Sequence, residues 1–147
     1  MAYTFNKFNS TVEAVGRKVH NLNADSLKIM LTNVAPVAGN SIKTDITDIA
    51  AGNGYAAGGS VIASSSYTQT SGVGKLIGNA VTFTASGGDM AAFRYAVIYN
   101  DSATNKELLG WYDYGVSVTL HDGEIFKAAK DTSGNNWDST IPILTFQ

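Results

Sequence analysis

The chain has 147 residues, and 44% of them are hydrophobic, which is enough for one globular domain with a self-supporting core. It contains no cysteine, so a disulfide framework and thiolate metal or redox chemistry are excluded. The net charge is −2, which does not favour sequence-independent binding to nucleic acid. No segment approaches the roughly 20 apolar residues of a membrane-spanning helix, and the N-terminus lacks a signal-like apolar region. We therefore expect a chain that is soluble where it is made, without nucleic-acid or membrane partners.

The first predicted element is an amphipathic helix over residues 10–20. Ser10 and Glu13 have the spacing of a capping box, which places the start of the helix at Ser10. Apolar residues recur at spacings of three and four, as on one helical face: Phe5, Phe8, Val12, Val15, Val19 and Leu22. This face is expected to pack against a sheet, or alternatively to dock on a partner chain.

The next segment changes its period from helical to strand-like. Apolar residues alternate with others over residues 27–31, which predicts a strand. Isoleucines then return to helical spacing, and we predict a short second helix over residues 43–50 that Asp45 and Asp48 cap or solvate. The glycine-rich residues 51–60 resemble a linker, but strands on both sides favour an ordered loop within one domain.

The rest of the chain reads as short strands separated by turn residues. Asp122 and Gly123 favour a type I′ hairpin turn, and residues 100–106 close a second, looser hairpin. The strand over residues 93–99 should be central in its sheet. The predicted strands cover residues 60–69, 74–77, 80–85, 93–99, 108–114, 116–120, 124–129 and 141–146. The sequence thus predicts one mainly β domain over residues 1–147, an antiparallel β-sandwich or jelly-roll-like barrel with an N-terminal amphipathic helix and a short second helix.

The sequence contains no convincing catalytic motif. Residues 52–57 spell G-x-G-x-x-A, but a dinucleotide loop leaves a strand and opens a helix, and here the order is reversed. Residues 72–75 lack the spacing of a phosphate loop. His20 and His121 are interpreted as solvated surface residues, too isolated to form a metal site. We predict that the protein is not an enzyme and has no catalytic, cofactor-binding or metal-binding residues.

Aromatic residues late in the chain are the best candidates for a binding surface. Trp111, Tyr112 and Tyr114, beside Trp137, could form a platform on which sugar rings stack, although core packing or subunit contact is favoured. The predicted partner interface combines these aromatic residues with the helical stripe and comprises Phe5, Phe8, Val15, Val19, Trp111, Tyr112 and Tyr114.

Five segments of the chain carry a resemblance: residues 5–8, 20–22, 26–33, 46–55 and 93–101. Together they resemble a widespread group of small structural proteins of tailed bacteriophages, and the similarity is taken to span nearly the whole chain. Members that resemble this pattern are virion components, and the best placement is a capsid decoration or cement protein outside the shell. The group has no catalytic motif, so no functional residue is carried over.

The resemblance implies a partner and a location. The partner would be the major capsid protein in its assembled lattice, and the chain would form a homo-oligomer, with a trimer favoured. It would be made in the bacterial host cytoplasm and located in the virion, at the capsid surface. Two alternatives stay open, namely a tail, neck or fibre component and a carbohydrate-binding module on the virion surface.

Overall fold

The computed structural model describes residues 4–128, 137 and 140–147. Within these residues the chain forms mainly β-strands, and all of the strand pairs are antiparallel. The strands are β1 (Thr4–Lys7), β2 (Leu27–Thr32), β3 (Ser60–Val61), β4 (Ser66–Thr70), β5 (Val73–Ile77), β6 (Val81–Thr84), β7 (Phe93–Asn100), β8 (Leu108–Val118), β9 (Ile125–Ala128) and β10 (Leu144–Phe146). The described helices are α1 (Ser10–Gly16) and the 3₁₀ turn η1 (Lys43–Asp45).

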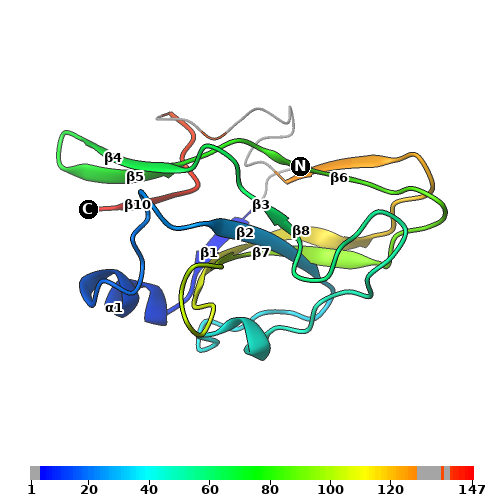
Figure 1. Cartoon of the computed structure of the whole chain (residues 1–147), viewed down its shortest axis with the longest axis horizontal. Coiled ribbons are helices and arrows are strands. Elements are labelled where there is room, and N and C mark those ends of the chain that lie inside the picture. The colour runs from blue at the N-terminus through cyan, green and yellow to red at the C-terminus, as the bar shows by residue number, and fades with distance from the viewer. Residues whose placement is uncertain (1–3, 129–136, 138–139) are drawn as a thin grey trace.

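The strands form three sheets in a layered arrangement. The largest has the order β1-β8-β7-β2-β3, and the smaller ones have the orders β10-β5-β4 and β6-β9. Figure 1 shows the two smaller sheets above the large one, with α1 and the connection from β2 to β3 below it. The architecture is sandwich-like and not a closed barrel, so the mainly antiparallel β prediction is confirmed and its jelly-roll-like barrel form is not.

The large sheet buries side chains on both faces. On one face, alternate β2 residues such as Ile29 and Leu31 belong to the core that lies between the large sheet and the smaller sheets. Met30 and Val97 belong to a second cluster on the other face, which also contains Phe8. Strand β7 lies between β8 and β2 and is buried at every position except Arg94, which confirms that it is central.

The connection between β2 and β3 is an ordered loop, as predicted, but its helix is much shorter than residues 43–50. Only η1 is helical, and its Asp45 carboxylate accepts hydrogen bonds from the backbone N–H groups of Ser41 and Ile42. After η1 the chain is extended at Ile46. Ile46 and Ile49 are therefore buried in different clusters, whereas a helix would have placed them on one face.

Several strand boundaries differ from those predicted. Strand β1 was not predicted, the strand over residues 60–69 is divided into β3 and β4, and the strands over 108–114 and 116–120 are one strand, β8. Residue 129, the last of the predicted strand 124–129, lies outside the described residues. These differences do not change the fold class.

The two predicted hairpins had different outcomes. Strands β7 and β8 pair across residues 101–107, which confirms the looser hairpin. The turn at residues 121–124 forms, but it joins β8 and β9, which lie in different sheets, so it closes no hairpin. Of its two central residues only Gly123 has a positive φ (88°), whereas a type I′ turn needs two. No helix among the described residues could span a membrane.

Candidate interaction site

Most of the predicted interface residues lie inside the protein. Phe8, Trp111, Tyr112 and Tyr114 are each at most 9% exposed. The ring centroids of Phe8 and Trp111 are 4.5 Å apart, and those of Tyr112 and Trp137 are 6.3 Å apart in a stacked pair. These rings pack against each other, so they offer neither a sugar platform nor a docking face. Their assignment to an interface is corrected to the core.

The remaining predicted residues, Phe5, Val15 and Val19, are half-buried. Phe5 lies in β1 instead of the helical stripe, with its ring centroid 5.0 Å from that of Tyr112. Val15 and Val19 line separate hollows on either side of α1. The hollow at Val19 is the smaller, with a volume of about 150 Å³.

Helix α1 ends four residues earlier than predicted, because the chain turns into the left-handed conformation at Lys18. There φ is 61°, the N–H of Lys18 donates to the carbonyl of Val15 (3.1 Å) and that of Val19 donates to Ala14 (2.8 Å). This pair of bonds is a Schellman motif, whose left-handed position is usually glycine. A helix cannot continue through it to His20.

The predicted face and cap of α1 also need correction. Thr11 and Ala14 are the buried residues, whereas Val12 is 54% exposed. Thr11 turns inwards because its hydroxyl group donates to the carbonyl of Leu109 in β8 (2.7 Å). The capping box does not form, since Asn9 occupies the N-cap position without a side-chain bond.

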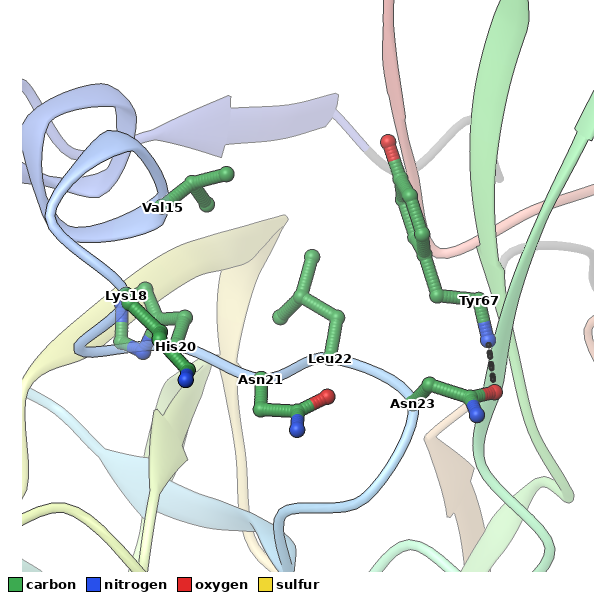
Figure 2. A pocket seen from close by; sticks show the side chains of 7 residues that line it. All are labelled: Val15, Lys18, His20, Asn21, Leu22, Asn23 and Tyr67. Atoms are coloured by element: carbon green, nitrogen blue, oxygen red, sulfur yellow. Dashed lines mark hydrogen bonds between the residues drawn. The ribbon is translucent and has the colours of Figure 1, made fainter.

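A groove of about 260 Å³ opens where the left-handed turn leads into residues 20–23. Figure 2 shows Val15 and Leu22 pointing into the space between α1 and Tyr67, which comes from β4. The loop is held to β4 by the backbone N–H of Tyr67, which donates to Oδ1 of Asn23 (3.3 Å). The complete lining is Val15, Lys18, His20, Asn21, Leu22, Asn23 and Tyr67.

The ring of Tyr67 has room to lie across β5 because residue 74 is glycine. A Cβ atom at Gly74 would lie 1.8 Å from the Tyr67 hydroxyl oxygen. Beyond it, the Tyr67 and Phe146 ring centroids are 6.3 Å apart, and Lys7 Nζ lies 5.4 Å from the Phe146 centroid. One wall of the groove is therefore a half-buried aromatic ring with a second ring behind it.

A buried polar network supports the groove from inside. His20 is only 4% exposed, so the prediction that it is a solvated surface residue is wrong. The Asn100 amide nitrogen donates to Asp25 Oδ2 (2.6 Å) and lies 3.1 Å from His20 Nδ1. Asn100 Oδ1 accepts the N–H groups of Ser102 and Ala103, which fixes the orientation of the amide.

This orientation determines which ring nitrogen of neutral His20 carries the proton. The amide nitrogen can only donate, so His20 Nδ1 is the acceptor and the neutral ring carries its proton on Nε2. Burial lowers the pKa of His20, against the opposing effects of the Leu108 carbonyl, Glu107 and Asp25. The ring acts as a fixed neutral support for the groove.

His121 is different because it lies at the surface, as predicted. Its Nδ1 is 3.1 Å from Asp89 Oδ2, and the hydrogen bond to this carboxylate raises the pKa of His121. Within the described residues no cluster of His, Cys, Asp and Glu could hold a metal ion. The chemistry available at the groove is apolar contact, amide hydrogen bonding and the positive charge of Lys18.

Sequence reasoning missed the groove because its parts come from a helix end, a loop and a strand more than 40 residues away. The run Asn21-Leu22-Asn23 directly after an amphipathic segment was the one local signal. No protein-family model matches the chain, and searches of curated proteins and of solved structures found no similar protein.

Proposed function

We propose that this protein is a non-catalytic structural component of a bacteriophage virion, and that it binds the assembled major capsid lattice as a decoration or cement protein. The sequence segments that resemble phage structural proteins support the virion assignment. They include all of β2 and β7, two neighbouring inner strands of the large sheet.

One structural observation carries the binding role, namely that the long connection between β2 and β3 is held rigidly. Asp48 accepts hydrogen bonds from the Tyr55 hydroxyl (2.5 Å) and the Gly58 N–H (2.6 Å). The hydroxyl group of Tyr99, in β7 of the large sheet, donates to the Gly58 carbonyl (2.7 Å). A surface that is ordered before binding loses less entropy on association, which suits a protein whose work is association.

The carbohydrate-binding alternative loses the residues that motivated it, because Trp111 and Tyr114 are buried. For the shell, binding energy that favours the assembled lattice raises its stability by mass action. We propose a homotrimer as the binding unit, because repetition on a symmetric lattice multiplies individually weak contacts.

The test uses phage particles that lack this protein. We expect the purified chain to bind these particles, to occupy the outer shell in electron-microscopy maps, and to raise the temperature at which DNA is released. Unassembled capsid protein is the control and should bind poorly, because the site would be composed across neighbouring subunits. Density at the tail or neck would replace the cement role with the tail alternative, and absence of binding to any particle would refute both.

A further inference from the structure

We infer that the outer edge of β4 and the adjoining groove form one docking site for an extended, acidic and apolar segment of another protein. The segment would add to β4 as a new antiparallel or parallel strand and place an apolar side chain in the groove. This mode of recognition takes its affinity from main-chain hydrogen bonds and its specificity from side-chain pockets. The inference is independent of whether the partner belongs to a capsid.

The first observation is that β4, from Gln69 towards its hairpin turn, is an open sheet edge. It pairs with β5 on one side, and on its other side lies no strand formed by the described residues. Natural edge strands are usually blunted by charged residues, proline or bulges, because an exposed edge is a template for pairing. Strand β4 reads Ser-Tyr-Thr-Gln-Thr and has no charge, proline or bulge. Asn23 already occupies the Tyr67 N–H, so the open part of the edge lies at Gln69. In Figure 1 its hairpin with β5 extends to one end of the molecule.

The register shows which groups face outwards. Ser71 and Gly72, with φ of 51° and 80°, form the two-residue loop between the paired Thr70 and Val73. In such a type I′ hairpin the residues flanking the loop bond to each other, so alternate residues, here Gln69 and Tyr67, direct their N–H and C=O groups outwards. The outward bond from the Tyr67 N–H to Asn23 agrees with this phase. Gln69 is exposed, and among the described residues no backbone hydrogen bond or second strand pairing involves its outward main-chain groups.

The second observation is the apolar groove beside this edge. Tyr67 belongs to both features, since its main chain lies on the edge and its ring forms a wall of the groove. Val15 and Leu22 supply apolar surface on the opposite side (Figure 2). Side chains of an added strand alternate between its two faces, so a residue near Tyr67 can direct an apolar side chain into the groove.

The charge of the groove indicates which kind of segment it would bind. Lys18 lies on the groove rim without an ion pair to any described residue, whereas the neighbouring Arg17 is paired with Glu13 (2.9 Å). Asp25 does not line the groove, and Lys18 is the one acidic or basic side chain besides the buried His20 among its described lining residues. The accessible charge at the groove is therefore positive in a chain of net charge −2, which favours an acidic partner segment.

The experiment titrates the isotope-labelled full chain with a short synthetic peptide of alternating Val and Glu, followed by NMR. We expect shifts at Gln69, Lys18 and Leu22 and slower exchange of the Gln69 N–H. The Gln69→Pro variant removes this outward N–H without removing a bond to β5, and it should lose binding. Lys18→Glu should weaken binding about tenfold and favour a Val–Lys peptide instead. Lys127→Glu, the same charge change on β9, is the matched control and should bind as the unmodified chain does.

Each outcome is decisive. Failure of every peptide to bind, or equal binding by Lys18→Glu and Lys127→Glu, overturns the inference. If Gln69→Pro does not fold, as judged by circular dichroism, the comparison of Lys18→Glu with Lys127→Glu tests the inference by itself. Self-association of the unmodified chain that blocks peptide binding and is lost in Lys18→Glu would make a second copy the occupant and overturn the assignment to another protein.

Discussion

The hydroxyl group of Tyr55 donates a 2.5 Å hydrogen bond to Asp48 and accepts a 3.0 Å hydrogen bond from the backbone N–H of Leu31. A single side chain thus joins two parts of the β2–β3 connection to the large sheet. Burial and the Asp48 hydrogen bond raise the pKa of Tyr55, so the phenol stays protonated and keeps donating. The rigidity proposed for the binding surface depends on this group.

Tyr55→Phe should lower the free energy of unfolding by about 2–3 kcal/mol, because it leaves the buried Leu31 N–H and the Asp48 carboxylate without their shared partner. Chemical denaturation measures the change. Tyr67→Phe is the control, since that residue is half-buried, and it should cost less than about 0.5 kcal/mol. Equal losses in the two variants would contradict the role given to the Tyr55 hydroxyl.

Gly59 and Gly72 both have positive φ values, 77° and 80°, but very different surroundings. A Cβ atom at Gly59 would lie 1.8 Å from the carbonyl oxygen of Ile29, whereas at Gly72 nothing lies within 4 Å. Gly72→Ala should cost about 1 kcal/mol for its backbone conformation alone. Gly59→Ala should cost several kcal/mol or prevent folding, because β2 would have to move. Thermal melts compare them, and similar melting temperatures would refute the close approach to Ile29.

Because His20 is buried, we expect the stability of the folded chain to fall as the pH is lowered. Its pKa in the folded chain lies below the ordinary value of 6.5, so the unfolded chain binds more protons as the solution is acidified. The stability contributed by the neutral ring is complete above about pH 6.5 and is lost as the pH falls through the lower pKa, by at most about 1.4 kcal/mol per unit. Asp25 and Glu107, which favour the proton, moderate the loss.

Denaturation of the unmodified chain and of His20→Gln between neutral and mildly acidic pH checks this dependence. The unmodified chain should lose stability on acidification, and the variant should show a flatter profile. His121→Gln is the control, because the raised pKa of His121 acts in the opposite direction and its removal should not flatten the loss. A profile that flattens only in His121→Gln would show that the wrong histidine was assigned.

The sequence pattern predicted those parts of the fold whose residues act locally. Residues 93–99 are apolar or aromatic at every position except Arg94, and this identified the central strand β7, because a strand that is covered on both faces has apolar residues on both. The same reasoning failed at Ile46 and Ile49, where helical spacing coincided with an extended chain that buries each residue in a different cluster. Tertiary contacts determined the conformation of that segment, and the local spacing of apolar residues gives no information about such contacts.

The candidate site was harder to predict than the fold. Aromatic residues were taken as surface candidates, yet Tyr112 and Trp111 proved to be core residues, because large rings supply much of the apolar area that a small β-protein buries. The groove instead depends on pairing between Tyr67 and a loop near Asn23. No periodicity connects two such distant segments.

The left-handed turn at Lys18 gives the last prediction. A residue with a Cβ atom is strained at φ of 61°, by about 1–2 kcal/mol, whereas glycine is not. Lys18→Gly should therefore stabilise the chain by about 0.5–1 kcal/mol after the greater entropy of the unfolded glycine is subtracted.

Arg17→Gly is the matched control one residue earlier, where φ is −87° and glycine relieves no strain. It should destabilise the chain by about 1 kcal/mol through unfolded-state entropy and the loss of the exposed ion pair with Glu13. Urea denaturation of both variants should give opposite signs. Destabilisation by both substitutions would mean that Lys18 carries no backbone strain. Glycine would then be no better than lysine at the left-handed position of the Schellman motif.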